Sequence, residues 1–138
     1  NVVIRYELEK KLIEGSLKTS DIPAFWNEHY QSYLGISPTN DKSGCLQDVH
    51  WSHGSFGYFP TYSLGSLYAA QFFSTISSAT NNSLQAIEQG DSRFILNWLR
   101  ENIHSYGRKF TSEELCKRTT GTTLDIQYLY IVKVRLNL

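Results

Sequence analysis

Apolar residues recur at helical intervals in the first quarter of the chain. They stand every four positions from Ile4 to Leu12, which places them on one face of a helix that Gly15 can end. A second helix is predicted after it, with Pro23 in its first turn, where the missing N–H costs nothing, and with Gly35 at its end. The first 35 residues are therefore expected to form two amphipathic helices.

The same periodicity returns after Pro60 and continues almost to the end of the chain. A TxxE capping box at Thr111 and Glu114 marks one of the helix starts. A Ser/Asn-rich break at 77–83 separates the longest helix from the next one. The helices predicted from these signals cover residues 60–76, 84–88, 92–103, 111–120 and 124–136.

Residues 36–57 interrupt this helical pattern. They contain Pro38, Gly44, Gly54 and Gly57 and show no sustained period, so they predict either a long Gly-rich loop or a short hairpin. Long ordered loops inside compact domains often carry function. We therefore expect an all-α fold, a single helical domain over residues 1–138, with one functional loop.

Composition excludes several classes of protein. The chain has 13 basic and 13 acidic residues and a pI near 7.1. It therefore lacks the excess positive charge that is typical of nucleic-acid-binding proteins. No apolar run reaches the roughly 20 residues that span a membrane, and no signal peptide is recognisable, which favours a cytoplasmic protein. Cys45 and Cys116 are too few for a disulfide framework, and we expect reduced thiols.

The segment 44–62, GCLQDVHWSHGSFGYFPTY, concentrates the polar chemistry of the chain. A possible metal site is suggested by the spacing of Asp48, His50 and His53. A zinc ion, however, needs three or four converging ligands, and this loop offers no third imidazole or thiolate. No metal ligand is therefore assigned here. A His50 that only hydrogen-bonds Asp48 inside the loop, and a solvated His53, remain the plain alternatives.

Several parts of this segment match one family closely. The stretch resembles the GxxQDxHW motif of the Taq-type thermostable zinc carboxypeptidases and is followed by the family's GYFPTY at 57–62. Residues 4–9, IRYELE, resemble the preceding family motif, commonly IRxxAD. The residues that match GxxQDxHW are Gly44, Gln47, Asp48, His50 and Trp51.

The resemblance implies a helical zinc peptidase, yet half of its active site is missing. Family members hold zinc with two His of an HExxH helix and a more distant Glu, and no HExxH occurs in these 138 residues. It implies that this chain is the C-terminal part of a larger, mostly helical metallopeptidase, with the zinc ligands outside it. We expect no zinc in the fragment and no activity from the fragment alone.

The resemblance also gives roles to the aromatic residues of the loop. It implies that His50 lines the substrate cleft, that Tyr62 donates a hydrogen bond to the oxyanion of the reaction, and that Tyr58 binds substrate. The order of the two Tyr stays open, and both could simply pack as wall residues. Trp51, Phe56 and Phe59 are expected to lie uncovered in the fragment and to favour a homodimer or self-association.

Three further residues receive supporting roles. Arg5 is expected to point away from the apolar stripe of its helix and, by resemblance, to bind the α-carboxylate of a peptide's C-terminus or to close the groove. An exposed Arg5 paired with Glu9 is nearly as consistent with the sequence. Gln47 and Asp48 are expected to orient the loop that carries His50.

A different class of function also fits the sequence. A non-catalytic helical binding or interaction module could retain the same wall without the zinc helices. An HExxH motif in frame upstream of Asn1 in the coding sequence would favour the peptidase.

Overall fold

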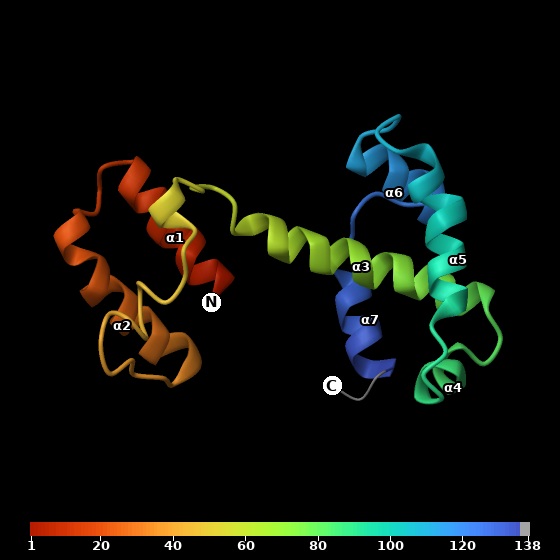
Figure 1. The fold of residues 1–138 in the computed structure, drawn as a ribbon, viewed down its shortest axis with the longest axis horizontal. Coiled ribbons are helices and arrows are strands. Elements are labelled where there is room, and N and C mark those ends of the chain that lie inside the picture. The colour runs from red at the N-terminus through yellow and green to blue at the C-terminus, as the bar shows by residue number, and fades with distance from the viewer. Residues whose placement is uncertain (136–138) are drawn as a thin grey trace. The chain divides into compact units, whose positions relative to one another are not determined.

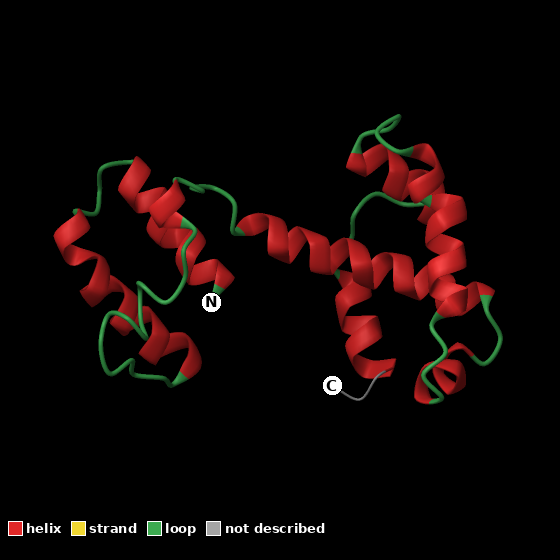
Figure 2. Cartoon of the chain, in the orientation of Figure 1, coloured by secondary structure: helices red, strands yellow, loops and turns green. Residues whose placement is uncertain are grey.

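The structure is a computed structural model, and it describes residues 1–135 of the chain. Every regular element in these residues is helical and none is a strand (Figure 2), which confirms the all-α prediction. Residues 36–57 form a loop with one 3₁₀ turn, η2 (Trp51–His53), so the hairpin alternative is wrong. The chain divides into two compact units, Asn1–Ser63 and Leu64–Leu138, which are described separately. A single domain stays a prediction.

The first unit contains the two helices predicted at the start of the chain. They are α1 (Val2–Ile13) and α2 (Ile22–Leu34), joined through the 3₁₀ turn η1 (Thr19–Asp21) (Figure 1). Gly35 ends α2 with φ of 67°, a left-handed conformation that glycine adopts without a Cβ clash, as its position predicted.

The core of this unit lies between α1, α2 and the loop. Its buried members are Ile4, Leu8, Trp26, Tyr30 and Cys45. Because burying a large apolar side chain stabilises a fold by about 1.5–3 kcal/mol, this small cluster is the main source of packing energy in the unit.

Two charged side chains of α1 are buried beside that apolar cluster. Arg5 is 1% exposed and Glu9 is 3% exposed. The prediction that Arg5 points away from the apolar stripe is wrong, because the buried face of α1 is wide enough to include the position after Ile4 and the position after Leu8. Charges are rarely buried unless they are paired, so the loop that covers α1 must supply partners for both.

The second unit is built around the long helix α3 (Pro60–Ala79), whose first turn belongs to the first unit. It continues through Ser77, where the sequence predicted a break, and ends at Ala79. Ser78 Oγ donates to Ser74 O at 2.9 Å, a hydrogen bond that a Ser can make inside a helix. The remaining elements, shown in Figure 1, are α4 (Ser83–Glu88), α5 (Arg93–Asn102), η3 (His104–Tyr106), α6 (Ser112–Thr120) and α7 (Gln127–Arg135).

Local sequence signals locate some of these ends correctly. The capping box predicted at Thr111 and Glu114 is present: the Glu114 backbone N–H donates to the Thr111 side chain, and the Thr111 backbone N–H donates to the Glu114 side chain. Hydrogen bonds from Thr111 lower the pKa of the Glu114 carboxyl. The last helix begins at Gln127, three residues after the predicted Leu124, and its predicted end at Leu136 lies outside the described residues.

Two further expectations from composition concern thiols and membranes. Cys45 and Cys116 are free, buried thiols, and burial raises the pKa of each. Within residues 1–135, none of the helices has the length and apolar character needed to cross a bilayer.

Candidate functional site

Three polar aromatic side chains meet where the loop enters α3. His50 Nε2 lies 3.0 Å from Tyr62 Oη, and the His50 ring stacks on the Tyr58 ring at a centroid distance of 5.9 Å. The two phenol rings contact edge to face at 5.4 Å. Pro60 starts the helix between them, so the first turn of α3 brings Tyr62 back over Tyr58. We call His50, Tyr58 and Tyr62 the His–Tyr cluster.

Asp48 fixes the orientation of the His50 ring. Its Oδ1 lies 3.0 Å from His50 Nδ1 and accepts a hydrogen bond from the His50 backbone N–H at 3.2 Å. A carboxylate can only accept, so Nδ1 donates to it. In a neutral imidazole the other nitrogen is then the acceptor, and Tyr62 O–H donates to Nε2. The hydrogen bonds thus run in one direction, from Tyr62 through His50 to Asp48.

Arg5 pairs with the Asp48 carboxylate. Its Nη2 contacts Asp48 Oδ2 in an ion pair, and its guanidinium carbon lies 4.4 Å from the centroid of the Trp26 ring. The rings of Trp51 and Phe59 lie at 5.1 and 4.8 Å. Burial lowers the pKa of Arg5, and the negative charge of Asp48 opposes that effect. A cation among three aromatic faces is held by cation–π attraction as well as by its carboxylate.

The position of Arg5 bears directly on its expected contact with substrate. The side chain is 1% exposed and faces a carboxylate from its own chain. The alternative of an exposed Arg5 paired with Glu9 is wrong. A substrate carboxylate could reach this guanidinium only by replacing Asp48, so the geometry favours an action of Arg5 through Asp48 and His50.

The remaining motif residues fasten the loop to α2. Gln47 Nε2 donates to Tyr30 Oη at 3.1 Å. A Cβ on Gly44 would meet Asn40 O at 3.1 Å and Trp26 Cδ1 at 3.4 Å, so the loop backbone approaches the Trp26 ring more closely than a side chain would allow. The GxxQ part of the motif therefore holds the loop against α2, and the DxH part supplies Asp48 and His50 to the hydrogen bonds of the site.

Glu9 is a site residue that the sequence analysis assigned only to an exposed pair. Its Oε1 accepts from Trp51 Nε1 at 2.8 Å, and its Oε2 accepts from the Gly57 backbone N–H at 3.0 Å. The spacing of four residues between Arg5 and Glu9 was the available signal, because it puts both on one helix face. Their partners, however, are more than 40 residues away in sequence.

The donor set of the cluster does not fit a zinc ion. Among residues 1–135 no group of three or more His, Cys, Asp or Glu side chains could hold a metal. Both ring nitrogens of His50 are already engaged, and His53 lies 6.1 Å away between ring centroids, with its Nδ1 on Ser55 Oγ. No reaction step is therefore assigned to a metal on this chain.

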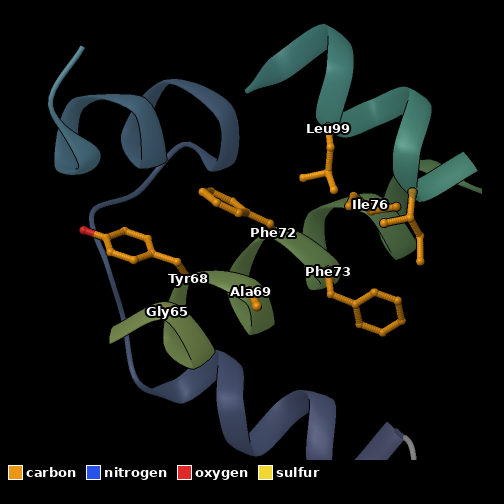
Figure 3. Close-up of a pocket in the computed structure, with 8 residues that line it drawn as sticks. Gly65, Tyr68, Ala69, Phe72, Phe73, Ile76 and Leu99 are labelled. Atoms are coloured by element: carbon orange, nitrogen blue, oxygen red, sulfur yellow. The ribbon is translucent and has the colours of Figure 1, made fainter. Parts of the chain in front are cut away.

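The second unit contains a cavity of a different character. It has a volume of about 380 Å³ and lies between α3 and α5, as Figure 3 shows. The Tyr68 hydroxyl is the one polar side-chain group in its lining, and burial raises the pKa of that phenol. The lining residues are Gly65, Tyr68, Ala69, Phe72, Phe73, Ile76, Ile95 and Leu99. Such a cavity can hold an apolar group but offers no acid, base or nucleophile.

The all-α fold and the polar aromatic wall on the GxxQDxHW loop agree with what the resemblance to a helical metallopeptidase implied. The family model described as Carboxypeptidase Taq (M32) metallopeptidase matches residues 1–134, and the chain belongs to that family.

Known relatives agree with this assignment. Carboxypeptidase 1 of Bacillus subtilis (strain 168) is 40% identical over 129 residues, which is 94% of this chain and 26% of the relative. Thermostable carboxypeptidase 1 of Thermus thermophilus is 42% identical over 121 residues, 88% of this chain and 24% of the relative. The chain thus spans about a quarter of the length of these proteins, which is consistent with a C-terminal portion.

Solved structures give the same result for the fold. The crystal structure titled BsuCP superposes with a TM-score of 0.90 at 39% identity, over 99% of this chain and 28% of that one. Metallocarboxypeptidase 1 of Trypanosoma cruzi superposes with a TM-score of 0.88 at 42% identity, over 97% of this chain and 28% of that one.

Proposed function

We propose that the chain is the C-terminal part of a zinc metallocarboxypeptidase and that the His–Tyr cluster forms one wall of its substrate cleft. The observation that carries this proposal is the hydrogen bond between His50 and Tyr62, which Asp48 extends and Arg5 supports. The zinc ligands lie outside this chain, in the remainder of the longer protein. The fragment alone is inactive, and the substrate of the whole protein is the C-terminus of a peptide.

The proposed chemistry of the wall is hydrogen bonding to developing charge. Hydrolysis of a peptide bond puts a negative charge on the former carbonyl oxygen, and a phenol O–H about 2.7–3.1 Å away stabilises that charge without ionising itself. Tyr62 is the proposed donor, Tyr58 binds substrate, and His50 lines the cleft beside both. A single donor of this kind is worth about 10²–10³ in kcat.

One observation favours the reverse order of the two Tyr. With a neutral His50, the Tyr62 hydrogen already points at His50 Nε2. Tyr58 is 49% exposed, and its hydroxyl makes no hydrogen bond within the described residues. Tyr58 is therefore the alternative oxyanion donor, with Tyr62 serving to orient His50.

The supporting residues complete the proposal. Asp48 and Gln47 orient the loop, and Arg5 acts on the recognition of the substrate's C-terminus by holding Asp48 in place. A cytoplasmic location remains part of the proposal, as does a homodimer, which the family resemblance supports.

Kinetics of two phenol-to-phenyl variants in the longer peptidase test these roles. With an N-blocked dipeptide as substrate, we expect Tyr62→Phe to lower kcat by about 10²–10³ and to change KM little, because the lost bond forms mainly in the transition state. Tyr33→Phe is the matched control, since the Tyr33 hydroxyl bonds Glu7 on the surface. A loss confined to Tyr58→Phe would exchange the two roles, and wild-type kcat in both would remove the wall from catalysis.

A non-catalytic binding module is the second candidate. The apolar cavity of Figure 3 favours it, because such a lining suits the docking of an apolar side chain. An upstream coding sequence without an in-frame HExxH motif would support this module over the peptidase.

A further inference from the structure

Glu9 joins two loop positions that flank the His–Tyr cluster. Its two carboxylate oxygens accept from Trp51 Nε1 at 2.8 Å and from Gly57 N at 3.0 Å. Trp51 directly follows His50, and Gly57 directly precedes Tyr58. One buried carboxylate on α1 therefore fixes the chain beside both of these side chains.

Hydrogen bonds inside this loop, such as Ser55 N–H to His50 O and Phe56 N–H to Gly54 O, both at 2.9 Å, tie its first part, whereas the Gly57 N–H donates to Glu9. Gly54 and Gly57 both have positive φ values, 78° and 77°, and glycine gives the backbone more freedom than any other residue. Phe56 reaches the Trp51 ring at a centroid distance of 6.4 Å but is itself 45% exposed. A rigid partner on the adjacent helix is thus needed to hold the spacing of His50 and Tyr58.

We propose that Glu9 is a positioning residue that clamps residues 51–57 and thereby sets the geometry of the His–Tyr cluster. The catalytic consequence rests on the proposed function, whereas the clamp itself does not. Both oxygens are needed, because each accepts from a different donor. Glu9 acts only through the loop, at the points next to His50 and Tyr58.

The variant that separates this role from simple packing is Glu9→Gln. Glutamine has nearly the same shape, but only one of its terminal atoms is an acceptor, so it can serve Trp51 or Gly57 and not both. Glu14→Gln is the matched control, since Glu14 caps the C-terminal end of the same helix, α1, is exposed and pairs with Lys10 at 3.8 Å.

Steady-state kinetics of the longer peptidase test the catalytic consequence. A misplacement of about 1 Å can cost about 10²-fold in rate, so we expect Glu9→Gln to lower kcat about 10-fold to 10²-fold with KM changed less than about threefold. We also expect the kcat losses of Glu9→Gln and Tyr62→Phe to be less than additive in the double variant, because both act on the same His–Tyr cluster. Additive losses, or a kcat equal to that of Glu14→Gln, would overturn the positioning role.

Hydrogen exchange in the same full-length protein tests the clamp without turnover. Because one glutamine oxygen cannot serve both donors, we expect either the Gly57 amide or the Trp51 indole N–H to exchange at least about tenfold faster in Glu9→Gln than in wild type or Glu14→Gln. Unchanged exchange at both positions refutes the clamp. A wild-type protein without carboxypeptidase activity but with this exchange difference would refute the proposed function and leave the clamp standing.

Discussion

At the residue scale, the site depends on two buried charges of α1 and the loop groups that neutralise them. Arg5 is paired with Asp48, and Glu9 accepts from Trp51 and Gly57. A buried ion pair adds little stability compared with an apolar pair of the same size, but removing one partner leaves a charge that water cannot reach. The pairs therefore serve to specify how the loop sits on α1 more than to increase stability.

Asp48→Asn tests this account of Arg5. The substitution preserves the shape of residue 48 but leaves the buried guanidinium without a negative charge. We expect it to lower the free energy of unfolding by about 3 kcal/mol. Urea denaturation measures this loss, and Asp41→Asn, on an exposed residue of the same loop, should change the free energy by less than about 0.5 kcal/mol. Equal stability of the two variants would show that the ion pair does not hold the loop.

At the element scale, Gln71 joins α3 to the segment between α6 and α7. It is fully buried, and its Nε2 donates to Thr120 Oγ1 at the end of α6 at 2.9 Å and to Thr123 O of that segment at 3.1 Å. Its Oε1 accepts from Asp125 N at 2.9 Å. One amide thus provides both the donor and the acceptor that this irregular segment needs.

Gln71→Glu should therefore be far more damaging than its size suggests. The substitution turns a donor facing several oxygens into a second acceptor, so lone pairs would oppose one another in a buried site. We expect a loss of about 3 kcal/mol in the free energy of unfolding, measured by thermal denaturation. Gln85→Glu, an exposed change on α4, is the control. Equal melting temperatures for the two variants would contradict this role of Gln71.

Local signals in the sequence predicted where helices begin and end better than they predicted which residues contact each other in the fold. Pro23, Gly35 and the Thr111 capping box mark helix ends correctly, because capping depends on residues within a few positions. The burial of Arg5, Glu9 and Gln71 was not predictable from periodicity, since each depends on partners more than 40 residues away. The GxxQDxHW motif located the candidate site, but the hydrogen bonds among Asp48, His50 and Tyr62 could be assigned only from the structure.

At the scale of the whole molecule, the two units carry different surfaces. The first unit buries part of its own aromatic wall. Phe59 is 4% exposed, so the expectation that it lies uncovered is wrong. Trp51 is half-buried and donates its indole N–H to Glu9. Phe56 remains exposed at 45%. The second unit has the open apolar cavity between α3 and α5, which makes it the better candidate for association.

Light scattering of the isolated 138-residue chain tests that inference. We expect the chain to self-associate with rising concentration, because the second unit also exposes large apolar side chains such as Leu96, Leu129 and Ile131. Leu99→Lys, which puts a charge into the cavity lining, should weaken the association at least about tenfold. Leu46→Lys, on an exposed Leu of the first unit, is the control, and equal weakening by both would exclude the cavity as the contact.

The His–Tyr cluster is proposed to take part in catalysis without holding the metal. Zinc content and kcat of His50→Ala, measured on the same preparation of the longer peptidase, test it most directly. We expect about one zinc per chain, as in wild type, together with a kcat reduced by about 10² or more. Zinc lost in step with activity would make His50 a ligand, and a kcat at the wild-type level would remove the cluster from the reaction; either result contradicts the proposed role of the cluster.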